Sequence, residues 1–252
     1  MRSPLLNKRF LFSWLILASA CQAPMAASPT PRPPGLSPQA VPSLTPRPSP
    51  IASTATATLP PAPRFFTDEF DGQPAYWTFL SSPAAANSPL AEVRAGLLQL
   101  NLDLPNETAL GLYGEQTYAD VRLNAQVEFG PDGAGAAGLV CRYDRGAGWY
   151  EFNIYADQTY TLLFGEWLQD GVIRYTPLVI SESEKISPAA NEIGLECAGD
   201  VLTPFVNGVQ LRRRQEKQHV LGEGQVGASV ASFEEYPLVI SYDWVAVGPA
   251  SP

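Results

Sequence analysis

The sequence predicts an all-β antiparallel domain, a two-sheet sandwich or a barrel, over residues 64–248. Apolar and polar residues alternate strictly in residues 96–104 and 119–129, which is typical of strands with one buried face. Turn signals such as Asn207-Gly208 separate the short strand-like segments of the domain. No segment keeps a helical period over ten residues. Together these observations favour a sandwich or a barrel.

The first part of the domain contains four strand-like segments. Residues 65–72 open it with Phe70 pointing inward, and a second apolar patch precedes the loop at residues 81–89. In residues 96–104 and 119–129 the alternation places one set of side chains in the core. These are Leu98, Leu100, Leu102 and Leu104 in the first segment, and Val121, Leu123, Ala125, Val127 and Phe129 in the second.

The centre of the domain is a predicted hairpin. Residues 138–144 and 148–155 are rich in aromatic and β-branched side chains and flank a short turn that contains glycine. Pairing the two strands about this turn brings apolar residues together and opposite charges together. The expected pairs are Cys141 opposite Phe152 and Arg142 opposite Glu151.

The rest of the domain is predicted to form further strands. Residues 191–211 contain two tight turns in a three-stranded meander. Pro204 lacks an N–H group, so its strand requires a bulge or an unpaired neighbour there. The remaining predicted strands cover residues 159–167, 172–180, 224–233 and 238–247.

Residues 1–20 have the features of a signal peptide. Basic residues precede an apolar run far shorter than the ~20 residues of a membrane-spanning helix, and small residues follow it. The stretch from Leu17 to Cys21 resembles the bacterial lipobox, in which the cysteine is acylated, although its leucine lies one place too early. Ordinary cleavage after Ala20 is the alternative. Either route makes Cys21 the first residue of the mature chain.

Residues 21–63 are expected to be the lipidated Cys21 and a tether. The tether is mostly Pro, Ala, Ser and Thr with no acidic residue, so it cannot bury enough apolar surface to fold. Extended as polyproline II it would reach roughly 130 Å. We expect the domain to be exported and held by lipid on the outer side of a bacterial membrane, or otherwise secreted. Residues 249–252 form a tail.

The other two cysteines, Cys141 and Cys197, are an even pair in an oxidising compartment, which favours a disulfide. Two buried free thiols are the alternative, because both cysteines alternate with apolar residues. The single histidine, His219, and the lack of Cys or His pairs at ligand spacing predict no transition-metal site. A calcium site in the loops would have to use Asp132, Asp157, Asp170 or Asp200.

The domain from residue 64 onward carries 11 basic and 25 acidic residues, a net charge of −14. Such a charge repels nucleic acid and anionic lipid, so membrane contact is expected through the lipid anchor only. Residues 212–214, three arginines, form the one basic cluster. We interpret them as charges that protect an edge strand. We expect a monomer.

Residues 65–247 resemble the concanavalin A-like, or laminin G-like, jelly rolls of bacteria. The most specific segment pairs a G-x-x-C-R strand at 138–142 with a C-x-G-x-x-L-x-x-x-V-N-G stretch at 197–208. The resemblance is greatest to the branch labelled 3-keto-disaccharide hydrolase domains. It implies two curved antiparallel sheets face to face, and members that bind or cleave glycans.

Glycoside hydrolases of this fold carry paired acids in an E-x-D-x-x-E pattern. Glu69 and Asp71 match its first half, but Pro74 stands where the second Glu is required. In the central strand, Asn153 stands where the Asp is required and Ala156 where the second Glu is required. We therefore assign no catalytic residue.

A glycan-binding face is easier to derive. If Tyr150, Phe152 and Ile154 point into the core, their neighbours lie on the outer face, where aromatic rings stack on sugars and carboxylates or amides bind hydroxyls. Alternatively, Glu151 only pairs with Arg142 across the strands. The candidate site residues are Trp149, Glu151, Asn153, Tyr155 and Arg142.

The sequence thus predicts a surface-anchored, non-catalytic jelly-roll protein that needs no cofactor and binds a glycan. Two alternatives remain at this point. One is a hydrolase that acts on a disaccharide or another glycan, and the other is a module that binds an envelope protein.

Replacing Cys21 with Ser should release the protein from membranes and abolish labelling by a fatty-acid analogue, because the acylated thiol is then missing. Membrane fractionation and metabolic labelling of both proteins measure this. A wild-type protein that takes up no label and is wholly soluble outside the cell would contradict the predicted anchor.

Overall fold

In the computed structural model, residues 60–83, 90–168 and 171–251 are described. The predicted signal peptide, Cys21 and the tether up to residue 59 lie outside these residues. Within the described ranges, no helix is long and apolar enough to cross a membrane.

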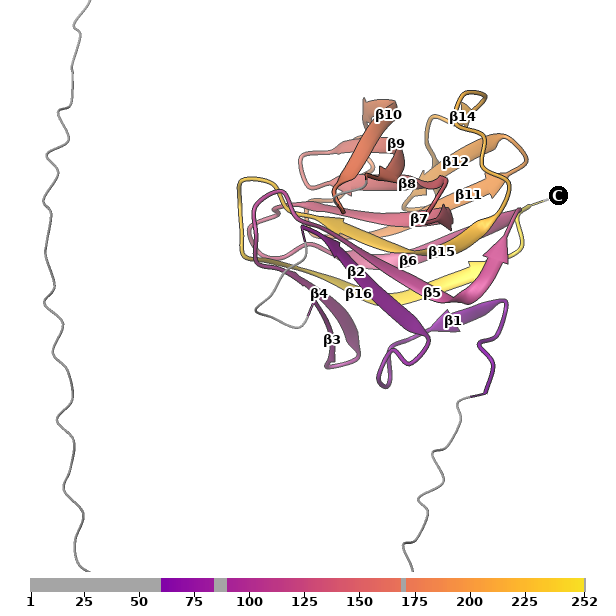
Figure 1. Ribbon diagram of the computed structural model, residues 1–252. Coiled ribbons are helices and arrows are strands. Elements are labelled where there is room, and N and C mark those ends of the chain that lie inside the picture. The colour runs from indigo at the N-terminus through magenta and orange to yellow at the C-terminus, as the bar shows by residue number, and fades with distance from the viewer. Residues whose placement is uncertain (1–59, 84–89, 169–170, 252) are drawn as a thin grey trace, which may run out of the picture. The chain divides into compact units, whose positions relative to one another are not determined.

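The described chain forms two antiparallel sheets (Figure 1). The nine-stranded sheet has the order β13-β12-β11-β6-β16-β4-β3, with β1 beside β16 and β14 beside β12. The seven-stranded sheet has the order β10-β9-β8-β7-β15-β5-β2. The nine strands of the first sheet are β1 (Phe66–Asp68), β3 (Ala91–Arg94), β4 (Leu97–Leu102), β6 (Val121–Glu128), β11 (Ala190–Ala198), β12 (Val201–Val206), β13 (Val209–Gln210), β14 (Arg214–Gln215) and β16 (Leu238–Gly248). The seven of the second are β2 (Trp77–Ser82), β5 (Thr108–Tyr118), β7 (Ala136–Asp144), β8 (Gly148–Tyr155), β9 (Thr159–Trp167), β10 (Ile173–Glu182) and β15 (Gly224–Ala231).

The predicted fold class, a two-sheet antiparallel sandwich, is confirmed. The core between the sheets contains the predicted alternating residues except Leu104, which lies beyond the end of β4 and is only partly buried. Burying each large apolar side chain stabilises the fold by about 1.5–3 kcal/mol. Phe70 is buried as expected, although β1 ends two residues before it. The fully buried alternating residues are Leu98, Leu100 and Leu102 of β4 and Val121, Leu123, Ala125 and Val127 of β6.

The sequence did not single out β5, because Gly111 and Gly114 interrupt its alternation. This strand of 11 residues lies between β15 and β2. Thr108 pairs with Ala231 where β5 begins, and Tyr118 pairs with Gly224 where it ends. At about 3.3 Å per residue, β5 extends over roughly 30 Å and connects the two ends of the sandwich.

The chain joins the domain at the end of the sandwich where β5 finishes. Residues 60–64 lie against the domain as a strap that precedes β1. β1 pairs with β16 in the nine-stranded sheet, whereas β5 belongs to the seven-stranded sheet. Three side chains donate hydrogen bonds to the backbone carbonyls of the strap. They are Tyr76 to Pro60 (3.1 Å), Gln116 to Ala62 and Tyr118 to Arg64.

The predicted hairpin exists as β7 and β8, but its predicted register is wrong. Cys141 lies opposite Tyr150 rather than Phe152, and Val140 rather than Arg142 lies opposite Glu151. The cause is a bulge between Cys141 and Asp144, with Arg142 at φ 54°. A bulge adds a residue to one strand and shifts every pair on one side of it.

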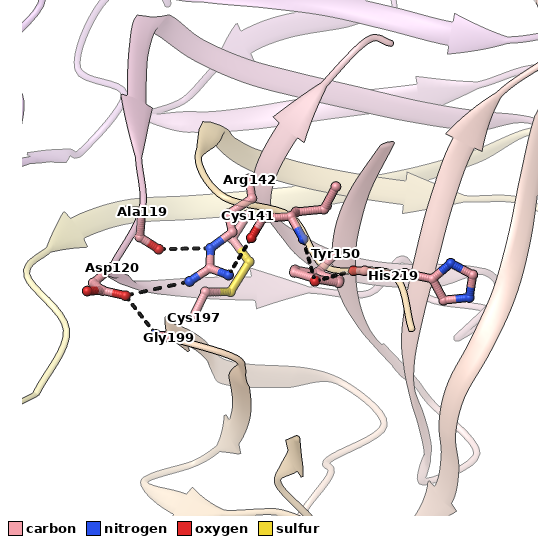
Figure 2. Close-up of a disulfide and its surroundings, with 9 residues drawn as sticks. Ala119, Asp120, Cys141, Arg142, Tyr150, Cys197, Gly199 and His219 are labelled. Carbon is pink, nitrogen blue, oxygen red and sulfur yellow. Dashed lines mark hydrogen bonds and ion pairs between the residues drawn. A yellow bond between two sulfur atoms is a disulfide. The ribbon is translucent and has the colours of Figure 1, made fainter. Parts of the chain in front are cut away.

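Cys141 and Cys197 form a disulfide between β7 and β11, which belong to different sheets (Figure 2). Both cysteines are fully buried and their Cα atoms are 6.8 Å apart. The predicted pairing is confirmed. A covalent bond between buried β-strands of an otherwise cysteine-poor domain fits an exported protein, because disulfides persist in oxidising compartments.

Arg142, next to this disulfide, binds two separate parts of the chain (Figure 2). Its guanidinium donates to the carbonyls of Ala119 (2.8 Å) and Leu221 (2.9 Å) and lies 3.5 Å from the carboxylate of Asp120. The carboxylate of Asp120 in turn accepts a hydrogen bond from the backbone N–H of Gly199, at 2.8 Å. Arg142 therefore fixes the turns around the disulfide.

Replacing both Cys141 and Cys197 with Ala should lower the free energy of unfolding by about 4 kcal/mol, because the chain-entropy cost of closing the loop is then no longer prepaid in the unfolded state. Urea unfolding of the oxidised wild type and of the double variant measures the difference. Reductant should destabilise the wild type and leave the variant unchanged. Two titratable thiols in the unreduced, denatured wild type would contradict the disulfide.

Candidate functional site

Residues 149–155 alternate between the two faces of the seven-stranded sheet as predicted. Tyr150, Phe152 and Ile154 belong to the core between the sheets. Their neighbours point to the opposite, outer face, but their predicted exposure is wrong. Exposed fractions are 0% for Trp149, 1% for Glu151 and 3% for Asn153.

Glu151 is the centre of a buried polar cluster on this outer face. Its carboxylate accepts hydrogen bonds from Trp149 Nε1 (2.8 Å), Asn153 Nδ2 (2.9 Å) and the Tyr175 hydroxyl (2.8 Å). All three donors are neutral, and the predicted partner Arg142 is not among them. Asn153 Oδ1 accepts from the Ser229 hydroxyl at 3.2 Å. The hydrogen bonds of this carboxylate are thus satisfied from within the protein.

The outer face is closed by a second apolar cluster and by the bending of its own sheet. Leu110, Leu112, Val140, Tyr143 and Trp149 are buried together there, with Trp167, Ile173 and Tyr175 packed on them. Trp149 lies so close to Gly165 that a Cβ on this glycine would be 2.5 Å from the indole ring. Ser82 of the edge strand β2 donates to the carbonyl of Gly171, just before the opposite edge strand β10 (3.1 Å). The two sheet edges therefore meet over Glu151 and its partners.

The other two candidate residues lie away from Glu151. Arg142 is at the disulfide, as described above. Tyr155 is partly buried at the end of β8, where its ring stacks on Phe233 with centroids 5.9 Å apart. Its hydroxyl lies 3.5 Å from Thr161 Oγ1. The structure thus brings Trp149, Glu151 and Asn153 together, and it links Tyr155 to the loop that contains Phe233.

Burial raises the pKa of several tyrosines around the outer face and the core. For Tyr175, burial first and then the negative charge of Glu151 raise the pKa well above its usual value. Burial likewise raises the pKa of Tyr155, and that of Tyr113 to about 12. These phenols remain protonated at neutral pH, and that of Tyr175 donates to Glu151.

A cavity of about 700 Å³ lies between the loop at residues 130–134 and the segment at residues 234–239. We call it the end cavity. It lies at the end of the sandwich where β5 begins, because β5, β7 and β15 meet there at Thr108, Ala136 and Ala231. In Figure 1 the loop between β15 and β16 is at the left, whereas β1 and the C-terminus are at the right. The end cavity is therefore remote from the strap.

The rim of the end cavity combines an aromatic ring with acidic side chains. Tyr236 is 50% exposed, and Asp132, Glu234 and Glu235 are exposed beside it. An adjacent cavity of about 480 Å³ shares Glu234 and Glu235 and adds Asn106, Gly135 and Phe233. We call the two together the end cavities. Phe233 is 42% exposed. The sequence analysis did not identify this arrangement, although two aromatic residues flanking Glu234 and Glu235, between the predicted strands at 224–233 and 238–247, were a usable signal.

The aspartates considered for calcium belong to separate turns of the chain. Asp132 lines the end cavity, whereas Asp157 and Asp200 accept hydrogen bonds from Thr159 N and Gln215 Nε2. Asp170 lies outside the described residues. Among the residues that are described, no three His, Cys, Asp or Glu side chains are close enough to hold a metal ion.

Comparison with solved structures places the domain in the concanavalin A-like jelly-roll fold. The Bacillus licheniformis β-glucanase is 11% identical, with a TM-score of 0.51 over 75% of this chain and 98% of that chain. A Bacillus subtilis protein of unknown function with a galectin-like fold is 11% identical, with a TM-score of 0.52 over 73% and 94%. A Bacteroides ovatus GH16 protein in complex with a G4G4G3G product is 10% identical, with a TM-score of 0.52 over 73% and 99%. No family model matches the sequence, and no curated protein is significantly similar to it. At these identities the likeness concerns the fold.

Replacing Tyr175 with Phe should lower the free energy of unfolding by about 1–2 kcal/mol, because Glu151 loses one of its donors. The pKa of Tyr175 is raised on folding, so its contribution is complete below pH 10 and is lost as the pH rises further. The variant should therefore lose less stability than the wild type between pH 9 and 11. Thermal unfolding across this range measures the effect, with the exposed Tyr236→Phe as control. Equal pH dependence in Tyr175→Phe and wild type would contradict the assignment.

Proposed function

We propose that the protein is an exported, lipid-anchored glycan-binding protein that does not cleave its ligand. The observation that carries this proposal is the pair of exposed aromatic rings, Phe233 and Tyr236, at the two adjacent end cavities. Aromatic faces stack on the apolar faces of sugar rings, and nearby carboxylates and amides accept or donate hydrogen bonds to hydroxyls. An exposed aromatic patch beside a cavity is typical of a binding surface.

The outer face of the seven-stranded sheet is a poor place for the same function. Trp149, Glu151 and Asn153 would have to lose their mutual hydrogen bonds before any sugar could reach them. The end of β8, where Tyr155 stacks on Phe233, is therefore a better place for the glycan site.

The neutral surroundings of Glu151 argue against hydrolysis. Retaining and inverting glycosidases need two carboxyl groups on either side of the scissile bond. The hydrogen-bond partners of Glu151 are neutral, and Glu69 and Asp71 lie beside the strap, at another part of the domain. A non-catalytic role is consistent with this separation.

The position of the end cavities agrees with an anchored protein. The strap lies where β5 ends, and the cavities lie where β5 begins, roughly 30 Å away along the strand. A tether attached at the strap would leave the opposite end of the domain, with its cavities, free to meet a ligand.

The protein should bind one or more glycans in a broad screen and release no product from them. Replacing Tyr236 with Ala should weaken binding by about 1 kcal/mol or more, as expected when a stacking ring is lost. Phe65→Ala is the matched control, because Phe65 is 44% exposed next to the strap. Product release would favour a hydrolase of the 3-keto-disaccharide type, and binding to an envelope protein without sugar would favour an interaction module. Either result would overturn the proposal.

A further inference from the structure

The two end cavities form one continuous surface with two aromatic rings. They share Glu234 and Glu235, and each contains one exposed ring, Tyr236 in the larger and Phe233 in the smaller. The rings are three residues apart in one segment, which β15 and β16 hold at both ends. Phe233 is further fixed by stacking on Tyr155. Two rings on a fixed segment provide two subsites.

The polar lining of this surface has one sign of charge. Asp132, Glu234 and Glu235 rim the larger cavity, and neither cavity is lined by a Lys or Arg among the described residues. Within that part of the chain, the four ion pairs leave these three carboxylates unpaired. Acidic groups on a surface are common, but here Glu234 and Glu235 line both cavities and lie between the two exposed rings in the sequence.

A fourth carboxylate, that of Glu107, is buried near the cavities at the same end of the domain. Glu107 is fully buried, and its backbone pairs with Ser232, the residue before Phe233. One carboxylate oxygen accepts from the N–H groups of Asp103 and Leu104 at 3.1 Å, while Oε1 has no hydrogen-bond partner among the described residues. The hydrogen bonds between the Glu107 backbone and Ser232 hold the segment that carries Phe233 in place.

We propose that the ligand of the end cavities is an oligosaccharide of at least two residues that carries positively charged amino groups. This inference rests on the proposed glycan-binding function and specifies its ligand. An ammonium group donates three hydrogen bonds to carboxylates, which only accept when ionised, and it is attracted by the faces of aromatic rings. Anionic glycans are repelled by the same groups, and a neutral sugar leaves the carboxylates without an opposite charge.

The test compares two matched ligand series on the full-length protein. De-N-acetylated oligomers of glucosamine supply amino groups, and N-acetylated oligomers of the same length lack the charge. Affinity for the amino series should exceed that for the acetylated series by about tenfold at low salt and fall as salt rises. It should also increase from the monomer to the dimer, because the second ring then has a partner.

Variants separate the charges from the rings. Glu234→Gln with Glu235→Gln should lower affinity for the amino oligomers by about tenfold and leave that for acetylated oligomers unchanged. Glu223→Gln, an exposed acid outside both cavities, is the control. Tyr236→Ala should weaken both series. Thermal unfolding of each variant verifies that the fold is kept.

The outcomes distinguish this inference from the proposed function. If neutral glycans bind as tightly as amino oligomers, and the double variant Glu234→Gln, Glu235→Gln binds both equally well, the inference of a charged ligand is wrong. The proposed glycan binding then still stands. If neither series nor any other glycan binds, both are wrong. Binding of amino oligomers that survives Tyr236→Ala and the Gln variants would place the site elsewhere and overturn the inference.

Discussion

The disulfide between Cys141 and Cys197 joins the two sheets of the sandwich covalently and holds β7 against β11. Around it, Arg142 contacts the β5–β6 turn, and through Leu221 it contacts the segment before β15. This arrangement requires the bulge in β7, which turns the guanidinium away from Glu151. Gly224 permits it, since a Cβ at that position would lie 2.4 Å from the carbonyl carbon of Arg142. The placement of β7 and β15 thus follows from one disulfide and one buried cation.

The same bulge shows which part of the fold could be derived from sequence. Alternation correctly predicted which residues of β4, β6 and β8 share a face, because the period of a strand is a local property. Register depends on every extra residue between two strands, and the positive φ of Arg142, a non-glycine residue, gave no signal in the sequence. The sequence analysis also missed β5, because Gly111 and Gly114 interrupt the alternation on which strand prediction depends.

The candidate site was harder to predict than the fold because its burial depends on distant residues. Tyr175 of β10 covers Glu151 of β8, and no pattern within residues 148–155 could reveal that contact. The end cavities likewise join loops about a hundred residues apart. In the sequence, residues 130–133 read as a turn and Phe233 as the end of a strand, so the aromatic residues beside the cavities were not recognised as a surface. Hydrophobic patterning gives the direction of a side chain but not what lies over it.

The strap at residues 60–64 has a mechanical consequence. A pull on the chain that precedes residue 60 would load the hydrogen bonds from Tyr76 and from Tyr118, and then the pairing of β1 with β16. Tyr76 and Tyr118 belong with the seven-stranded side of the sandwich, whereas β16 belongs to the nine-stranded sheet. Tension would therefore be shared by both sheets, and the disulfide between them would resist their separation. If the domain is anchored as proposed, it would withstand such tension without loss of its fold.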